Sequence, residues 1–254
     1  AILYRVFVEK ANYVFYITDV GQSLHFKMLF DLSRYLKLID NNTIVFEHIP
    51  CGFVFNENGK KIKTRSGESK DLLLFFNELV ETNKKICFES IGNSLDALSS
   101  SITFSSNLLK FHELSLHRLN DFFFNINKIL KTSKHSFIFI LYAFTRIQSI
   151  LRTFTLRYKN FRYSKLRLVT IYEYDLCFLI NKFSFVFECS FQLCMPHKLV
   201  EYLYTLSNCF NLFFEKCKIF YHSNMDTRFL LCMSVYNIML ECFFILGLDY
   251  SHRL

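Results

Sequence analysis

The stretch ANYVFYITDVGQSLHFKMLFDLSRYLKLI, which runs from Ala11 to Ile39, decides the fold class of the first part of this chain. Its opening residues are β-branched or aromatic as far as Asp19, so we predict a buried strand followed by a turn. The rest predicts a helix, because apolar residues recur at helical spacing: Leu24, Met28, Leu29, Leu32, Tyr35 and Leu36. NTIVFEHI, from Asn42 to Ile49, predicts a second strand. Strand, helix and strand in this order form a βαβ unit, hence a parallel sheet.

The second part of the chain carries long helical patterns. SFIFILYAFTRIQSILRTF is apolar almost all round, and RFLLCMSVYNIMLECFFILGL stops at Gly247. HKLVEYLYTLSNCFNLFFEKC repeats apolar residues on one helical face, namely Leu199, Tyr202, Leu203, Leu206, Phe210, Phe213 and Phe214. The serine-rich ESIGNSLDALSSSITFSSN favours a linker. We therefore predict an α/β domain over residues 1–85, a connecting segment over 86–110 and an all-helical bundle over 111–254.

The composition indicates a folded, basic protein. Of its 254 residues 52% are hydrophobic, which excludes a largely disordered chain. The formal net charge of +8 favours a polyanion as partner, because Lys and Arg that neutralise phosphates release counterions. An A/T-rich genome would also enrich the chain in Lys without any such partner, so both interpretations stay open at this point.

The nine cysteines form neither a disulfide pattern nor a metal pattern. Their number is odd and no CxxC pair occurs, so we expect free thiols in a reducing compartment and no metal site. HSFIFILYAFTRI reaches Arg146 after an apolar run that is too short to cross a bilayer. We accordingly expect no membrane partner.

Candidate binding residues follow the two predicted strands. Asp19 and Gln22 stand at the end of the first strand, and His48 and Gly52 at the end of the second. Ligands of parallel sheets bind beyond such strand ends. A structural role stays open for each residue, since Asp19 or Gln22 can cap the following helix and a lone His is more often structural than catalytic. No nucleophile is paired with His48, so covalent catalysis is not supported.

The loop GKKIKTRSGES, from Gly59 to Ser69, is the most basic candidate. It follows GFVFNENGKKIKT, which resembles a hairpin with its turn at Asn58–Gly59. Ammonium and guanidinium groups can stabilise phosphoryl oxygens. The loop lacks the GxxxxGK[ST] spacing of a Walker motif, so a solvated hairpin tip and a phosphate-binding loop are both open.

Taken together, six segments carry a family resemblance. YITDVGQSLHF, HIPCGFVF, GKKIKTRSGES, HELSLHRLNDFFF, ILYAFTRIQSILR and EYLYTLSNCFNLFFEKC occur in this order. Their order and spacing resemble the arginyl-tRNA synthetases, a family of class I aminoacyl-tRNA synthetases, over nearly the whole chain. The resemblance implies a partial Rossmann-type class I catalytic domain followed by an all-α anticodon-binding bundle. The family's His-Ile-Gly-His-type ATP motif has no counterpart in these residues.

The resemblance implies an ATP site and an arginine site in the first domain. KIKTRSG resembles the loop that closes over ATP and stabilises the departing pyrophosphate. Lys61, Lys63 and Arg65 would then supply catalytic charge. The residues implied to bind ATP are His48, Gly52, Lys63, Thr64 and Ser66. Gln22 matches a position that contacts the arginine substrate, with Asp19 beside it, and Mg²⁺ is implied alongside ATP.

The resemblance implies tRNA contacts in the helical bundle. Tyr142 matches an anticodon-facing aromatic residue, Arg146 and Arg152 are candidate phosphate contacts, and Phe210 and Phe214 match aromatics that contact anticodon bases. Since Phe210 and Phe214 share a face with Leu residues, a core role is open for both. The implied partners are tRNA-Arg, L-arginine and ATP, in a cytoplasmic monomer.

Three functions remain after these observations. The first is arginine–tRNA ligation, for which these residues alone are expected to be inactive. The second is a tRNA-binding module without ligase activity. The third is a basic helical scaffold, which would show no preference among tRNAs.

Overall fold

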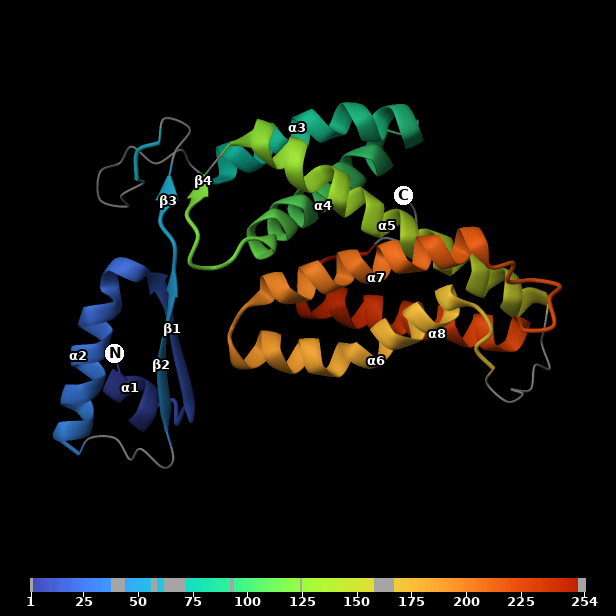
Figure 1. The fold of residues 1–254 in the computed structure, drawn as a ribbon. Coiled ribbons are helices and arrows are strands. Elements are labelled where there is room, and N and C mark those ends of the chain that lie inside the picture. The colour runs from blue at the N-terminus through green and yellow to red at the C-terminus, as the bar shows by residue number, and fades with distance from the viewer. Residues whose placement is uncertain are drawn as a thin grey trace. The chain divides into compact units, whose positions relative to one another are not determined.

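The computed structural model describes residues 2–37, 44–55, 59–61, 72–91, 94–123, 125–157 and 167–250. The chain divides into two compact units (Figure 1). Unit 1 comprises Ala1–Ser69 and His117–Phe124, and unit 2 comprises Lys70–Leu116 and Asn125–Leu254.

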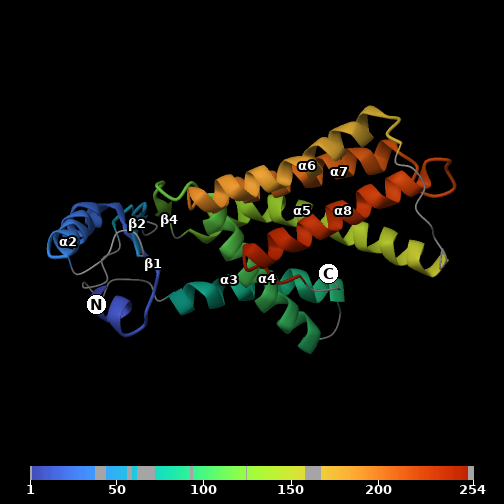
Figure 2. The same ribbon diagram turned by 90° about the horizontal axis from the view of Figure 1, so that it is seen from below.

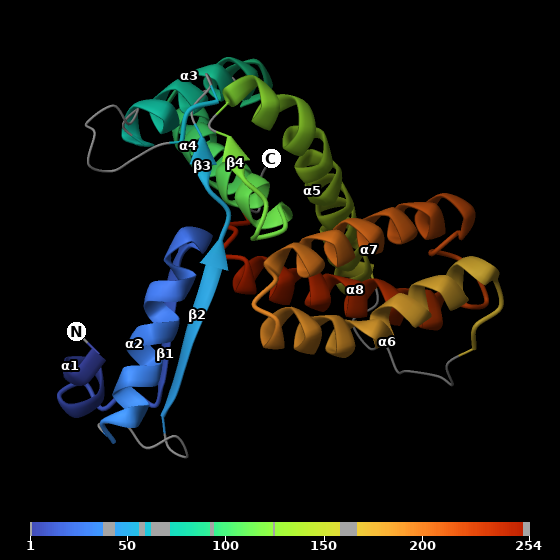
Figure 3. The ribbon, with the colours of Figure 1, turned by 60° about the vertical axis from the view of Figure 1, so that its left-hand side comes forward.

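Unit 1 contains the predicted βαβ arrangement. Its elements are α1 (Ile2–Phe7), β1 (Tyr13–Asp19), a 3-10 turn η1 (Val20–Gln22), α2 (Ser23–Tyr35), β2 (Val45–Cys51), β3 (Val54–Phe55) and β4 (Phe122–Phe123). Strands β1 and β2 pair in parallel from Tyr13↔Val45 to Asp19↔Cys51. Helix α2 connects them and lies along the pair (Figure 3). The prediction of a parallel sheet is therefore confirmed.

The burial of unit 1 differs from the prediction. Helix α2 buries Phe26 and Phe30, which pack with Ile2, Tyr16 and Phe46. The residues expected on its apolar face are instead mostly exposed: Leu24, Met28, Leu32, Tyr35 and Leu36. The prediction that strand β1 is buried is also wrong for one of its faces, on which Tyr13, Phe15 and Ile17 are exposed. The physical reason is that α1 and α2 supply the packing for one face of this two-stranded sheet.

The segment after β2 is held by the return of the chain at His117–Phe124. Strand β3 pairs in parallel with β4, which the sequence did not predict. Phe55 and Lys61 form an antiparallel bridge, and Gly59 has a φ of +71°. Both observations support the predicted hairpin, because glycine adopts positive φ without the steric cost of a side chain.

Unit 2 is helical in its described residues, as predicted. Its helices are α3 (Leu72–Ile91), α4 (Ser94–Ser115), α5 (Ile126–Arg157), α6 (Ile171–Gln192), α7 (Pro196–Lys216) and α8 (Met225–Ile245). Helix α6 packs on α7 and α8, α5 packs on α7 and α8, and α3 packs on α4. Figure 1 and Figure 2 show α6, α7 and α8 side by side, with the long helix α5 beside them.

The connecting segment expected over residues 86–110 lies largely within helices α3 and α4. Ser101 and Ser105 are buried, and the Asn83 side chain donates a hydrogen bond of 3.0 Å to the Ser105 hydroxyl. Small side chains let two helices approach, and the Ser101 hydroxyl donates to the Leu98 carbonyl at 2.8 Å. The serines therefore serve helix packing instead of a linker.

The core of unit 2 follows the predicted stripe of α7. The residues of that stripe that are buried are Leu199, Tyr202, Leu203, Leu206, Phe210 and Phe213. Helix α8 ends as predicted before Gly247, whose φ is +63°. Among the described side chains the cysteines form no disulfide, and Cys217, Cys232 and Cys242 are buried as apolar residues.

Two helical segments are longer and more apolar than their sequence patterns predicted. Ser136–Arg157 and Met225–Ile245 have the length and composition of membrane spans. In the structure their buried residues include Phe137, Phe144, Cys232 and Phe243, which belong to the core of unit 2. Core helices of this kind satisfy the same criteria of length and composition.

Candidate functional site

The ends of β1 and β2 bring three predicted site residues together. The Asp19 carboxylate accepts a 2.9 Å hydrogen bond from the Gly21 backbone N–H, which caps η1. Its other oxygen lies 3.5 Å from Gln22 Nε2. Lys61 Nζ lies 3.9 Å from Asp19 Oδ1 and 3.4 Å from the centre of the Phe53 ring. A carboxylate, an amide and a cation therefore meet beyond the strand ends.

His48 is engaged by neighbouring side chains. Its Nε2 lies 2.9 Å from Thr18 Oγ1, and its ring stacks on Phe26 at 4.8 Å. The same residue lines a pocket of about 210 Å³ with Ser23, Lys27, Phe30, Asp31, Arg34, Phe46 and Glu47. The ring is thus oriented by the sheet and α2 and also borders an open cavity.

Gly52 has a structural role in this fold. A Cβ atom there would lie 2.1 Å from the Asn120 carbonyl oxygen. The Gly52 N–H donates to the Arg118 carbonyl at 2.7 Å, and Arg118 Nη1 donates to the Pro50 carbonyl at 2.6 Å. The absence of a side chain at Gly52 therefore serves the close approach of the chain at Asn120.

Four predicted residues of the basic loop lie outside the described residues: Lys63, Thr64, Arg65 and Ser66. Lys61 is the member of the predicted catalytic set that the structure describes, and it faces Asp19.

A second cluster lies on helices α5 and α7 of unit 2. The Arg146 guanidinium lies 4.3 Å from the Tyr142 ring centre and 4.4 Å from that of Phe214. It donates to Asn211 Oδ1 at 3.1 Å and to the Tyr142 hydroxyl. Cation–π contacts with both rings hold the guanidinium in place while the rings remain partly exposed. Three predicted tRNA contacts, Tyr142, Arg146 and Phe214, are therefore brought together.

Arg146 borders a pocket of about 420 Å³, which we call the Arg146 pocket. Its lining residues are Arg146, Ser149, Ile150, Thr153, Phe214, Cys217, Lys218, Ile219 and Phe220. The pocket combines two cations and two hydroxyls with apolar walls. Such a surface suits a ligand with a flat ring and a phosphate.

The other two predicted tRNA contacts are placed differently. Phe210 is 0% exposed, so its ring has no free face for a base, in agreement with the alternative of a core role. Arg152 is exposed but is not among the residues that line the Arg146 pocket. Burial thus separates Phe210 from Phe214, although the two rings are close, at 6.3 Å.

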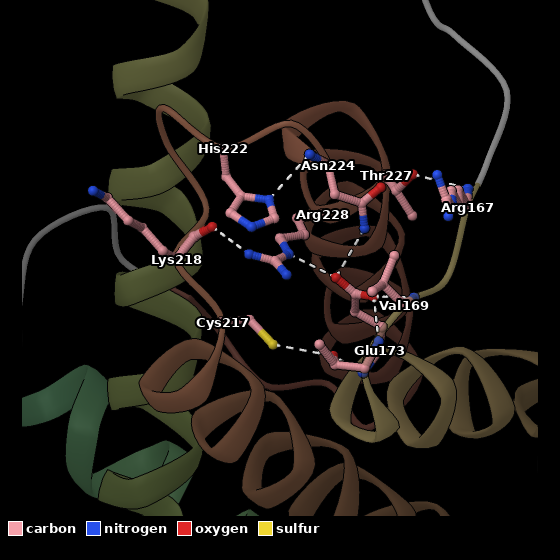
Figure 4. A network of polar contacts seen from close by, with 10 residues as sticks. Arg167, Val169, Glu173, Cys217, Lys218, His222, Asn224, Thr227 and Arg228 are labelled. Atoms are coloured by element: carbon pink, nitrogen blue, oxygen red, sulfur yellow. Dashed lines mark hydrogen bonds and ion pairs between the residues drawn. The ribbon is translucent and has the colours of Figure 1, made fainter.

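Sequence reasoning missed a buried ionic network at the start of α6 (Figure 4). Glu173 is fully buried, and its Oε1 accepts from Arg228 Nε at 2.6 Å and from Asn224 Nδ2 at 2.9 Å. Its Oε2 accepts from the backbone N–H groups of Val169 at 2.6 Å and Thr170 at 2.9 Å. Burial by itself raises the pKa of the Glu173 carboxyl, but these hydrogen bonds, that from Arg228 first, bring the pKa below its ordinary value.

The sequence contains a recognisable pattern for one half of this network. Thr170 and Glu173 form a capping box, and the T-x-x-E spacing before an apolar run is its sequence pattern. The partner Arg228 had no such signal, because it reaches Glu173 only through the packing of α8 on α6.

Two family profiles match this chain. The profile of "tRNA synthetases class I (R), catalytic domain" matches residues 1–126, and that of the "DALR anticodon binding domain" matches residues 140–254. The two matches follow each other without overlap and together account for most of the chain.

The relatives of this chain include arginine–tRNA ligases. The ligase of Protochlamydia amoebophila is 30% identical over 251 residues, which is 98% of this chain and 43% of the relative. That of Chlamydia felis is 32% identical and covers 100% of this chain and 45% of the relative. The chain thus spans less than half the length of the curated relatives it matches.

Solved structures show the same likeness. The arginyl-tRNA synthetase of Plasmodium falciparum matches 100% of this chain and 43% of its own, with a TM-score of 0.81 and 29% identity. That of Thermus thermophilus shares the fold with a TM-score of 0.73 at 18% identity.

Proposed function

Because the chain belongs to the arginyl-tRNA synthetase family, we propose that it supplies the part of an arginine–tRNA ligase that contains the ATP-closing loop and the anticodon-binding domain. The whole reaction joins arginine to tRNA-Arg at the expense of ATP. The chain corresponds to about 43% of a relative, so we propose that ligation requires the remainder of the catalytic domain.

The observation that carries the catalytic part is the meeting of Asp19, Gln22 and Lys61 at the strand ends. A carboxylate binds a guanidinium well, because both oxygens can accept hydrogen bonds from the planar donor. The contact of 3.9 Å between Asp19 and Lys61 exceeds hydrogen-bond length, so Asp19 retains acceptor capacity. We propose that Asp19 and Gln22 bind the arginine side chain.

Lys61 is proposed to act on ATP together with Lys63 and Arg65. The arginine carboxylate attacks the α-phosphorus, the bond to pyrophosphate breaks, and negative charge grows on the leaving oxygens. Cations placed at those oxygens stabilise the transition state. The tRNA terminal ribose hydroxyl then attacks the arginyl carbonyl, and AMP leaves. Positioning accounts for the second step, so no protein nucleophile is required.

The described residues include a candidate contact for ATP but no cluster of metal-ligating side chains for Mg²⁺. His48 borders a pocket lined by residues of α2 and β2, which supports a role near ATP, whereas Gly52 is closed off by Asn120. Within the described ranges no three His, Cys, Asp or Glu side chains cluster. We propose that Mg²⁺ is held mainly by the ATP phosphates, as is usual for this ion.

The Arg146 pocket is the proposed contact for the anticodon loop. Base stacking on an aromatic ring contributes about 1–3 kcal/mol per base, and the rings of Tyr142 and Phe214 are available for it. The net charge of +8 adds a general attraction for RNA. Phe210 is excluded from this surface by its burial. We propose a cytoplasmic monomer with no membrane partner.

The exposed apolar face of strand β1 supports the proposal that the remainder of the catalytic domain is required. Tyr13, Phe15 and Ile17 lie on one face of the strand, and all three are exposed. Apolar patches of this kind mark surfaces that another chain segment covers. We propose that the remainder of the catalytic domain packs there.

A pyrophosphate exchange assay with arginine, ATP and tRNA-Arg tests this function. We expect no exchange from the 254 residues alone and exchange when the N-terminal part of a relative's ligase is added. Exchange by the chain alone would refute the need for a second part. If no combination is active but the chain binds tRNA-Arg selectively, the tRNA-binding module without ligase activity is favoured. Equal binding to all tRNAs would favour a basic scaffold.

A binding assay tests the RNA surface separately. Arg146→Ala and Phe214→Ala are expected to weaken binding of a tRNA-Arg anticodon stem-loop by about tenfold or more, since each removes one stacking or charge contact. Arg152→Ala is the matched control, because Arg152 lies on the same helix but outside the pocket. An equal loss in Arg146→Ala and Arg152→Ala would indicate a diffuse charge effect.

A further inference from the structure

The loop between α7 and α8, residues 217–224, is held on its inner side by buried polar groups. Thr170 Oγ1 lies 3.3 Å from Cys217 Sγ. Arg228 Nη1 donates to the Lys218 carbonyl at 2.6 Å, and Asn224 Nδ2 donates to Glu173 Oε1 at 2.9 Å. The loop is therefore fastened to the first turns of α6 and α8, as Figure 4 shows for Lys218, Asn224 and Arg228.

The same loop forms one wall of the Arg146 pocket. Cys217, Lys218, Ile219 and Phe220 line the pocket together with Phe214 of α7 and residues of α5. The width of the pocket therefore depends on where the backbone of Lys218 is held. That position is set by Arg228, which is only 4% exposed and lies between Lys218 and Glu173.

We infer that Glu173 and Arg228 are positioning residues for RNA binding: the buried pair holds the α7–α8 loop at the distance from Arg146 that a nucleotide requires. Neither residue touches the ligand. The inference rests on the proposed function of the Arg146 pocket and extends it to residues on two further helices.

The chemistry of the pair suits this task. One planar guanidinium donates from Nε to Glu173 and from Nη1 to the Lys218 carbonyl. A single group therefore fixes both the distance and the orientation of the Lys218 carbonyl relative to Glu173. A lysine ammonium in its place is a point charge and cannot reproduce the fork. Glu173 accepts from four donors, so its carboxylate is itself held rigidly.

The loop has a second attachment near its middle. Arg157 Nη1 donates to the Tyr221 hydroxyl at 2.6 Å on the exposed side. This contact links the loop to the end of α5, but it is open to solvent. The buried contacts on the inner side are therefore the stronger constraint on the wall of the pocket.

The test uses Arg228→Lys and Asn224→Ala in the full chain. Arg228→Lys keeps the charge and loses the fork, whereas Asn224→Ala keeps the ion pair and releases one end of the loop. Leu79→Ala serves as a control for stability, because Leu79 is fully buried on α3, away from the loop. Anisotropy measures the affinity for a tRNA-Arg anticodon stem-loop, at a temperature where circular dichroism shows every variant folded.

A second readout follows the loop without RNA. Mass spectrometry measures the alkylation rate of Cys217, which is 2% exposed and lies in the loop. Cys232 and Cys242 on α8 are internal controls, since both are fully buried. Burial raises the pKa of Cys242 to about 12, so this thiol reacts only when the bundle opens.

We expect both loop variants to weaken RNA binding, Arg228→Lys by about tenfold, which is the lower end of the loss caused by removing the outer-shell partners of metal ligands. Cys217 is expected to react faster while Cys232 and Cys242 are unchanged, and Leu79→Ala is expected to leave RNA binding intact. Faster reaction of all three cysteines would indicate global loosening and overturn the inference.

Two further outcomes separate the inference from the function beneath it. If the unchanged chain fails to bind the stem-loop, the proposed function of the Arg146 pocket is refuted, and the RNA role of the pair with it. If the unchanged chain binds and folded Arg228→Lys binds equally well, the inference alone is overturned.

Discussion

The substitution Glu173→Gln removes the charge of a buried carboxylate and leaves its shape almost unchanged. Four donors surround the two carboxylate oxygens, at 2.6 and 2.9 Å on each oxygen. A carboxylate is purely an acceptor, whereas an amide has one oxygen and one NH2 group. Whichever way the new amide turns, its NH2 group therefore faces two donors.

The expected cost follows from these contacts. Removing one partner of a buried ion pair costs about 3–5 kcal/mol, because the other charge stays buried without compensation. Here that charge is Arg228, at 4% exposure. For a unit of this size, each kcal/mol lowers Tm by about 2–4 °C, so we expect a decrease of roughly 6–20 °C.

Urea and thermal denaturation followed by circular dichroism measure the effect. Glu81→Gln is the matched control, since Glu81 pairs with Lys84 at 3.3 Å on the exposed side of α3 and its loss should cost less than about 1 kcal/mol. If Glu173→Gln behaves like Glu81→Gln at neutral pH, the network does not stabilise unit 2 and the reasoning fails.

The pH dependence provides a second check on the same substitution. The pKa of Glu173 is lowered in the folded state from its ordinary value of 4.5. The stabilisation from its charge is complete above that ordinary value and is lost as the pH falls through the lowered folded value. The difference in stability between the unchanged chain and Glu173→Gln should therefore shrink in acid. A difference that is constant with pH would contradict the assigned charge state.

Further predictions concern packing. Gly52→Ala should cost roughly 1–3 kcal/mol, because the new Cβ would meet the Asn120 backbone at 2.1 Å; hydrogen exchange at the Phe53 and Phe122 amides measures it, and unchanged protection would refute the close approach. Phe210→Ala should lower the stability of unit 2 by about 3–5 kcal/mol, since the ring is fully buried. Phe214→Ala should cost less in urea denaturation, because Phe214 is only partly buried. A larger loss of stability for Phe214→Ala than for Phe210→Ala would contradict the burial assigned to the two rings. Ser105→Ala should cost about 1–3 kcal/mol by removing the 3.0 Å hydrogen bond that the hydroxyl accepts from the buried Asn83 amide, and equal Tm values would refute that contact.

Much of the fold could be predicted from local patterns. The β-branched and aromatic run of β1, the helical spacing of α2 and the order of elements were sufficient for a parallel βαβ unit, because periodicity reflects backbone geometry. The turn at Gly59 and the stop at Gly247 follow from the freedom of glycine at positive φ. The all-helical second unit likewise follows from long apolar stripes without breakers.

Predictions of burial were less successful where they depended on which other helix or strand packs against a residue. Helix α2 is apolar on most sides, so its pattern did not distinguish the buried Phe26 and Phe30 from the exposed Leu24 and Met28. Ser101 and Ser105 suggested a linker because small polar residues are common in loops, but they also suit closely packed helices.

The candidate sites divide in the same way. The sequence by itself determined the family, the residue types available at Asp19, Gln22 and Lys61, and the capping box of Thr170 and Glu173, since each depends on residue type and short spacing. Only the tertiary structure decided that Phe214 is a surface ring and Phe210 a core ring, and that Arg228 completes the pair with Glu173. The physical reason is that burial and buried pairing depend on which distant helix packs against a residue, and no local pattern contains that information.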